Sequence, residues 1–196
     1  MNVKVKICGI RSIEAAKTAA DAGADFLGFN FVPTSARYID PQPAAKTIHS
    51  FKRQVKIVGV FQDAEINYVN NLILTLGLDF VQLHGHENNE YINQLGIPVI
   101  KSIAIDGRPG SIKADYLLLD RVKRGEGKMI NFQKAAKLAA NYPVFYAGGL
   151  NPDNVAAVIQ KVKPFAVDVA GGIETNGRED LEKIKLFLKN AKGASI

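Results

Sequence analysis

The sequence has one cysteine, Cys8, among its 196 residues, which excludes an internal disulfide and is typical of a reducing compartment. No stretch approaches the ~20 apolar residues that cross a membrane, and the first residues lack the apolar core and cleavage site of a secretory signal. We therefore expect a cytoplasmic protein with no membrane partner. Linker-like and low-complexity segments are also absent, which predicts one domain over residues 1–196.

Motifs of several common enzyme classes are missing. The sequence has no Gly-x-Ser-x-Gly, no Walker loop and no dinucleotide fingerprint after its first apolar run. Of its three histidines, His84 and His86 flank Gly85, but no third metal ligand follows at a typical spacing, and His49 lies on a helix pattern. We therefore expect no metal site and take His49 as a surface residue.

The net charge is basic, at +6. The lysines are scattered over helix-like segments, and aromatic residues are not interleaved with them as they are on nucleic-acid platforms. This pattern is typical of a solvated surface that mildly steers an anionic substrate, and it predicts no nucleic-acid partner.

Short apolar runs alternate with amphipathic stretches along the chain. The predicted strands are Val3–Ile7, Phe26–Phe31, Lys56–Phe61, Phe80–Leu83, Val99–Ile103, Tyr116–Leu119, Val144–Tyr146 and Ala166–Val169. The predicted helices are Ser12–Ala22, Pro41–Phe51, Glu65–Leu76, Asn88–Leu95, Asn131–Asn141, Pro152–Val162 and Gly177–Lys189, followed by a frayed tail from Gly193.

The strands are apolar without strict alternation, which indicates burial on both faces and hence an α/β protein with a parallel sheet. Eight such units predict a (βα)8 TIM barrel at the compact end of its size range, with a doubly wound open sheet as the alternative. The crossover from Asp106 to Ala114 contains Gly107, Pro109 and Gly110, so we expect the fifth helix to be shortened or missing.

In such a barrel the active site lies at the C-terminal ends of the strands. Two glycine pairs follow the last two strands, Gly148-Gly149 and Gly171-Gly172, where backbone N–H groups can approach a phosphate. The alternative is that these glycines only form tight turns. We also expect Asn151-Pro152 to open a helix whose dipole favours an anion.

Cys8 and Asp120 end the first and sixth strands, so they can face each other across the mouth of the barrel. An acid and a base placed in this way suit isomerisation of a sugar by proton transfer. Three leucines precede Asp120, and these apolar neighbours would desolvate its carboxyl group and keep it a proton donor. The alternatives are a buried structural cysteine and an aspartate that caps a helix or lies in a loop.

Six segments, in order over nearly the whole chain, resemble the phosphoribosylanthranilate isomerase family. They are Lys6–Ile10, Phe31–Ile39, Val81–Gly85, Leu117–Asp120, Ala147–Val155 and Val167–Glu174. The resemblance implies a (βα)8 barrel of tryptophan biosynthesis. It also implies an Amadori rearrangement of N-(5-phosphoribosyl)anthranilate to 1-(2-carboxyphenylamino)-1-deoxyribulose 5-phosphate without a cofactor. The partner would be this phosphosugar, and the chain a monomer or a homodimer.

The resemblance also implies roles for single residues. Cys8 would be the general base that takes the C2 proton, and Asp120 the general acid that protonates the ring oxygen. Arg37 would meet the anthranilate carboxylate, for which a guanidinium fork is suited. Five further residues would bind the substrate, the last four through its phosphate: His84, Gly148, Gly149, Gly171 and Gly172.

Four positions depart from the family pattern: Arg11, Glu126, Asn131 and Gly171. Glu126 would repel an anionic substrate unless it points away or pairs with Lys128 or Arg124. A barrel that binds phosphate without catalysis is therefore one alternative. A sugar isomerase of histidine synthesis is another, but that class typically has an aspartate where this chain has Cys8. A basic nucleic-acid binder is the last alternative.

Overall fold

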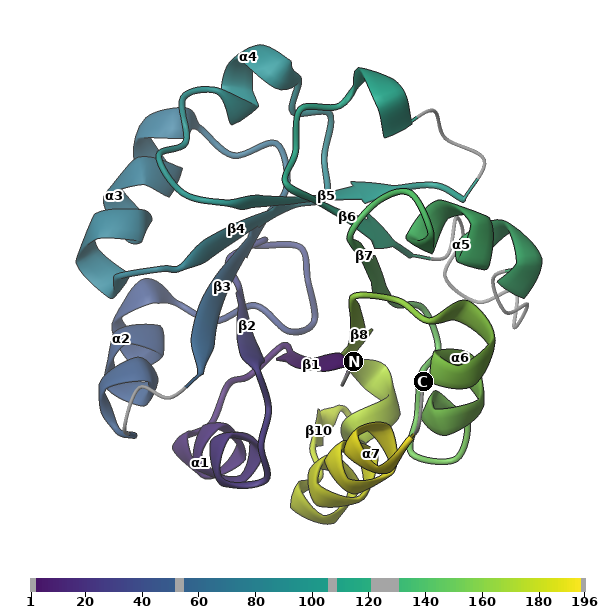
Figure 1. The fold of residues 1–196 in the computed structure, drawn as a ribbon. Helices are drawn as coiled ribbons and strands as arrows, with labels where there is room; N and C mark the ends of the chain where they lie inside the picture. The colour runs from purple at the N-terminus through teal and green to yellow at the C-terminus, as the bar shows by residue number, and fades with distance from the viewer. Residues whose placement is uncertain (1–2, 52–54, 106–108, 121–130, 195–196) are drawn as a thin grey trace.

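The computed structural model describes residues 3–51, 55–105, 109–120 and 131–194. Eight parallel strands pair in sequence order and close into a barrel, and helices surround it (Figure 1). The strands are β1 (Lys4–Cys8), β2 (Phe26–Asn30), β3 (Lys56–Phe61), β4 (Phe80–Leu83), β5 (Val99–Ile103), β6 (Tyr116–Leu119), β7 (Val144–Tyr146) and β8 (Ala166–Val169). The expected (βα)8 barrel is thus confirmed.

The helices follow the strands in the expected order. They are α1 (Ile13–Asp21), α2 (Pro41–His49), α3 (Ile66–Leu76), α4 (Asn89–Ile92), α5 (Phe132–Ala139), α6 (Val155–Val162) and α7 (Leu181–Gly193). Between β5 and β6 the described residues form only a 3-10 turn, Pro109–Ser111, in agreement with the shortened fifth crossover. None of the described helices is long and apolar enough to span a membrane.

Two helices start three or four residues later than predicted, whereas the other starts agree to within one residue. Helix α6 begins at Val155, because the side chain of Asn151 accepts hydrogen bonds from the backbone N–H groups of Asp153 and Asn154 and holds this segment in a turn. Helix α7 begins at Leu181, because the residues before it form a two-stranded antiparallel ribbon. Its strands are β9 (Glu174–Thr175) and β10 (Arg178–Glu179). Helix α7 also extends to Gly193, a residue that was expected in the frayed tail.

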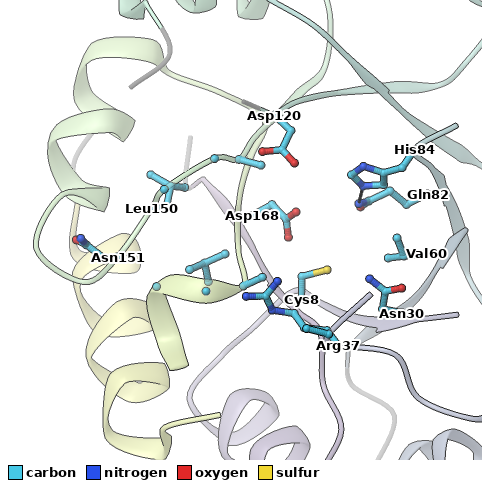
Figure 2. Close-up of a pocket in the computed structure, with 18 residues that line it drawn as sticks. Cys8, Asn30, Arg37, Val60, Gln82, His84, Asp120, Leu150, Asn151 and Asp168 are labelled. Atoms are coloured by element: carbon cyan, nitrogen blue, oxygen red, sulfur yellow. Dashed lines mark hydrogen bonds between the residues drawn. The ribbon is translucent and has the colours of Figure 1, made fainter. Parts of the chain in front are cut away.

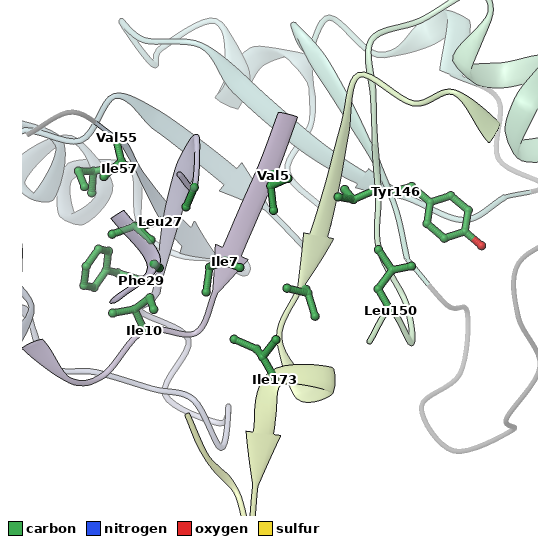
Figure 3. Packing of buried hydrophobic residues seen from close by; sticks show 14 of the residues in the cluster. Val5, Ile7, Ile10, Leu27, Phe29, Val55, Ile57, Tyr146, Leu150 and Ile173 are labelled. Carbon is green, nitrogen blue, oxygen red and sulfur yellow. The ribbon is translucent and has the colours of Figure 1, made fainter. Parts of the chain in front are cut away.

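The side chains of each barrel strand alternate between two environments, as strand geometry requires. Val5 and Ile7 on β1 pack outward with Leu27 and Phe29 on β2, in the layer between the strands and the helices (Figure 3). The inward-facing residues Phe26, Val58, Ile100, Leu118 and Phe145 form a separate apolar cluster inside the barrel.

Polar residues replace this apolar cluster further along the same inward faces. Lys6, Gln82 and Asp168 lie next to outward-facing core residues in sequence, so they point into the barrel, and each is at most 7% exposed. The barrel is therefore apolar towards the N-terminal ends of its strands and polar towards their C-terminal ends.

Candidate active site

A pocket of about 590 Å³ opens at the C-terminal ends of the strands. The structure brings all the predicted site residues together in its wall, although they come from six different βα segments (Figure 2). They are Cys8, Arg37, His84, Asp120, Gly148, Gly149, Gly171 and Gly172.

Cys8 ends β1 and is partly buried, with its thiol in the pocket wall. It shares the inner face of β1 with Lys6, whose ammonium is its hydrogen-bond partner. Gly28, its partner residue on β2, leaves the room for both groups. A Cβ atom at Gly28 would lie 2.8 Å from Cys8 Sγ and 3.1 Å from Lys6 Nζ.

A buried ion pair lies under the thiol. Lys6 Nζ donates a hydrogen bond to Asp168 Oδ1 over 2.9 Å, and the two side chains are 0% and 8% exposed. Burial disfavours the ammonium charge, but the attraction of Asp168 and Cys8 outweighs it, so the pKa of Lys6 is raised. Lys6 is thus a fixed positive charge beside the cysteine.

The thiol is subject to opposing influences. Burial raises the pKa of Cys8 and Asp168 adds to this effect, whereas the positive charges of Lys6 and Arg37 act in the opposite direction. The net result is a raised pKa. Cys8 is therefore a protonated thiol at neutral pH in the protein without substrate, with two cations placed to stabilise its thiolate.

Asp120 follows β6 directly and is partly buried. Figure 2 places its carboxylate across the pocket from the Cys8 sulfur, with Asp168 between them. The expected arrangement of Cys8 and Asp120 on two sides of one pocket is therefore what the structure has. A substrate bound between them would have the carboxyl group of Asp120 on one side and the thiol of Cys8 on the other.

His84 and Gln82 occupy the pocket wall on the β4 side. Their Nε2 atoms are 2.6 Å apart. Burial lowers the pKa of His84 to about 4, so its ring is neutral at physiological pH. Gln82 is 1% exposed, and its Oε1 atom has no hydrogen-bond partner among the described residues. Both side chains are thus neutral groups suited to sugar hydroxyls.

Arg37 reaches the pocket from the loop between β2 and α2. Its Nε and Nη2 atoms donate hydrogen bonds to the two carboxylate oxygens of Glu174, over 2.9 and 2.6 Å. The aliphatic part of its side chain crosses Gly9, where an added Cβ would lie 2.5 Å from Arg37 Cδ. A guanidinium held in this way faces the pocket with a fixed orientation.

The two glycine pairs meet each other. Gly148 and Gly149 both have positive φ, 81° and 84°, which side chains rarely adopt. A Cβ atom at Gly172 would lie 1.8 Å from the carbonyl oxygen of Leu150, so this contact between the loops after β7 and β8 needs glycine. The backbone of both loops is thus exposed to the pocket at close range, as a phosphate site needs.

The other two histidines and Asn131 lie outside the pocket wall. His86 is 95% exposed beside Asp63, and His49 is on the surface. In the described part of the chain no group of His, Cys, Asp and Glu side chains could hold a metal ion. Asn131 caps α5 by accepting a hydrogen bond from the Lys134 N–H. Glu126, with its neighbours Arg124 and Lys128, lies outside the described residues.

Four residues of the site were not singled out from the sequence. They are Lys6, Gln82, Asp168 and Glu174. The period of two along a strand gave a usable signal for the first two, because Lys6 precedes Cys8 by two residues and Gln82 precedes His84 by two. Nothing in the sequence paired Glu174 with Arg37, which is 137 residues earlier.

Known proteins resemble this chain over nearly its full length. A family model described as N-(5'-phosphoribosyl)anthranilate (PRA) isomerase matches residues 5–190. The N-(5'-phosphoribosyl)anthranilate isomerase of Geobacter sp. (strain M21) is 43% identical, with 98% of this chain and 99% of that protein covered. The enzyme of the same name from Streptococcus mutans is 39% identical, with 96% and 98% covered.

Solved structures agree with these relatives. The phosphoribosyl anthranilate isomerase of Thermotoga maritima superposes with a TM-score of 0.88 at 36% identity, covering 97% of this chain and 99% of that one. A phosphoribosyl anthranilate isomerase in complex with reduced 1-(o-carboxyphenylamino)-1-deoxyribulose 5-phosphate gives a TM-score of 0.85 at 34% identity, with the same coverage.

Proposed function

This chain belongs to the N-(5'-phosphoribosyl)anthranilate isomerase family, and on that premise we propose how its pocket carries out the reaction. The enzyme isomerises N-(5-phosphoribosyl)anthranilate, an aminoaldose, to 1-(2-carboxyphenylamino)-1-deoxyribulose 5-phosphate in tryptophan biosynthesis. The reaction moves protons and opens a ring, with no net oxidation. It therefore needs one group that gives a proton and one that takes a proton.

The two ends of the substrate bind to different groups in the pocket wall. The phosphate lies against the backbone N–H groups of the loops that contain Gly148, Gly149, Gly171 and Gly172. The anthranilate carboxylate pairs with Arg37. The neutral side chains of Gln82 and His84 form hydrogen bonds with the ribose hydroxyls, as donors or as acceptors. Fixing both ends places the sugar between Cys8 and Asp120.

Asp120 is the general acid. Its carboxylic acid protonates the furanose ring oxygen, the C1–O bond breaks, and the nitrogen lone pair forms an imine with C1. The open chain then has an acidic hydrogen at C2, because the protonated imine accepts the electrons released there. Ring opening thus prepares the substrate for the base.

Cys8 is the general base. Its thiolate takes the proton from C2, the C1–N double bond accepts the electron pair, and an enolamine forms that tautomerises to the ketone. The thiol of Cys8 loses its proton to solvent to become this base, and the ammonium of Lys6 stabilises the thiolate at hydrogen-bond distance. Asp120 gives one proton to the substrate and Cys8 takes one from it. Proton exchange with solvent then restores both groups.

The observation that carries this assignment is the position of Cys8 and Asp120 on two sides of one pocket (Figure 2). The test is the loss of anthranilate-type fluorescence when the purified protein meets freshly made substrate. Asp120→Asn and Cys8→Ala should each lower kcat by about 10²–10⁴-fold with substrate binding largely intact. Full turnover in either variant would assign that role to another residue.

The wild-type protein also decides between the isomerase and a barrel that only binds phosphate. No fluorescence loss, together with binding of the reduced product analogue, would support the inactive barrel. The need for a free thiol at Cys8 supports a reducing compartment, and we assign the protein to the cytoplasm. The described residues that line the pocket belong to one chain, and we propose a monomer or a homodimer.

A further inference from the structure

Four charged side chains contact one another beside the part of the pocket where Arg37 is proposed to bind the anthranilate carboxylate. They are Arg11, Arg37, Glu174 and Glu179, whose side chains are 24%, 23%, 12% and 8% exposed. Glu174 accepts both hydrogen bonds from Arg37 and a third from Arg11 Nη2 at 3.3 Å on Oε1. Because these groups are partly buried, their interactions are screened less than those of surface pairs.

Arg11 joins this group to two segments of backbone. Its Nη1 donates to the carbonyl of Ala36, the residue before Arg37, over 3.1 Å, and its Nη2 donates to the carbonyl of Gly177 over 2.7 Å. Nη2 also contacts Glu179 at 3.4 Å. Arg11 therefore fixes Glu174 and the Arg37 loop relative to each other.

The guanidinium of Arg37 has a second edge to offer. It has five N–H donors, and Glu174 uses the Nε–H and one N–H of Nη2. Within the described part of the chain, the two N–H groups of Nη1 and the other N–H of Nη2 have no acceptor, and they form a second fork for a planar carboxylate. Gly171 leaves space here, since a Cβ atom at that residue would lie 3.1 Å from Arg37 Nη2.

Charge balance explains why two arginines are present. Glu174 accepts hydrogen bonds from both arginines, so its negative charge is shared between Arg37 and Arg11. Arg11 and Glu179 complete a neutral set of two cations and two anions, in which Glu174 is shared between the arginines. Glu174 thus fixes the orientation of Arg37, and Arg11 offsets part of the negative charge of Glu174.

We propose that Glu174 and Arg11 are positioning residues that set the affinity and specificity for the carboxylate of the anthranilate ring. Glu174 holds one edge of Arg37 so that the other edge faces the ligand, and Arg11 holds Glu174. This inference rests on the role proposed for Arg37. It extends the substrate-recognition machinery to two residues that do not themselves touch the substrate.

The test compares two ligands in calorimetric titrations. One is the reduced product, 1-(2-carboxyphenylamino)-1-deoxyribitol 5-phosphate, and the other is the same compound without the ring carboxylate. Glu174→Gln and Arg11→Met should weaken binding of the first about tenfold and change binding of the second less than twofold. In turnover, KM should rise with little change in kcat. Arg178→Met is the matched control, because Arg178 lies exposed on the same ribbon, and it should change neither ligand.

The outcomes separate this inference from the proposed function. Equal weakening of both ligands would make the charged group a structural support only, and no weakening would remove its role. Arg37→Met belongs in the same titrations. If Arg37→Met loses the preference for the carboxylate and the other two variants keep it, only this inference fails. If Arg37→Met keeps the preference, the proposed role of Arg37 fails first.

Discussion

Lys6 and Asp168 are register partners on the first and last strands of the barrel, and their charges meet 2.9 Å apart in its interior. The ion pair therefore lies at the seam where the barrel closes. It also lies directly under Cys8, the residue proposed as general base. One pair of side chains thus connects the closure of the fold to the chemistry of the thiol.

Removal of one member of this pair should destabilise the protein strongly. Lys6→Met leaves Asp168 buried without its cation, which typically costs about 3–5 kcal/mol of unfolding free energy. The double variant Lys6→Met/Asp168→Asn should recover much of that loss, because neither side chain is then charged. Urea unfolding of both variants measures this. A Lys6→Met protein as stable as the wild type would show that the ion pair contributes little.

The pH dependence of the reaction should report the Cys8 thiol. Since burial raises the pKa of Cys8, kcat/KM should increase with pH above neutrality as the thiolate forms in the free enzyme. Lys6 opposes this shift, so Lys6→Met should move the increase to higher pH, whereas Lys6→Arg, which keeps the charge, should move it less. Lys4→Met on the same strand is the control, because Lys4 is half exposed and pairs with Asp25.

Alkylation of Cys8 by iodoacetamide gives an independent readout. Its rate should follow the same pH dependence in each variant, since only the thiolate reacts. A wild-type alkylation rate that is already maximal at neutral pH would contradict a raised pKa for this thiol.

The barrel could be predicted from the sequence because both faces of its strands are buried. Such strands read as continuous apolar runs, and Lys56–Phe61 and Tyr116–Leu119 have the same bounds in the prediction and the structure. Ser12 was likewise expected to cap the first helix, and its side chain accepts a hydrogen bond from the Ala15 N–H.

The predicted start of α7 was wrong, although the sequence does contain a signal for the turn that delays the helix. Asn176-Gly177 is the preferred pair for a two-residue hairpin turn, and both residues have positive φ, 52° and 74°. This turn forms the β9–β10 ribbon and delays the helix. The ribbon also places Glu174 next to Arg37, a contact between distant segments that no local pattern could specify.

The positions of the catalytic candidates could be predicted, but their surroundings could not. Cys8 and Asp120 follow apolar strands, so the fold alone assigns them to one end of the barrel. The pairing of Lys6 with Asp168, 162 residues later, depends on barrel closure and on the register between β1 and β8. A sequence pattern gives the inward direction of each side chain but not its partner.

Gly28→Ala should disturb the thiol without touching the phosphate site. The added methyl group would approach Cys8 Sγ at 2.8 Å and Lys6 Nζ at 3.1 Å, so one of these groups must move. We expect kcat to fall about 10²-fold, the lower end of what a misplaced general base costs, with an overpacking penalty of about 1–3 kcal/mol. Inorganic phosphate should bind as in the wild type.

Gly96→Ala is the matched control for this experiment. Nothing lies within 4 Å of a Cβ atom at Gly96, and its backbone conformation suits any residue. Its turnover and stability should equal those of the wild type. If Gly28→Ala also had wild-type turnover, the positions of the thiol and the ammonium would not limit the reaction.

Gly172→Ala should weaken phosphate binding and leave the Cys8 thiol unaffected. A Cβ atom there would overlap the carbonyl oxygen of Leu150 at 1.8 Å, and this oxygen belongs to the backbone, which cannot yield as the end of a flexible side chain can. The loops after β7 and β8 must then separate, which moves the N–H groups proposed to bind the phosphate. We expect inorganic phosphate to bind at least about tenfold more weakly and KM to rise, an effect of ~1.4 kcal/mol or more.

The alkylation rate of Cys8 should stay unchanged in this variant, because β1 is not part of this contact. A loss of phosphate binding together with a changed alkylation rate would instead indicate that the whole mouth of the barrel rearranges, and the glycine pairs could then not be assigned to the phosphate from this variant.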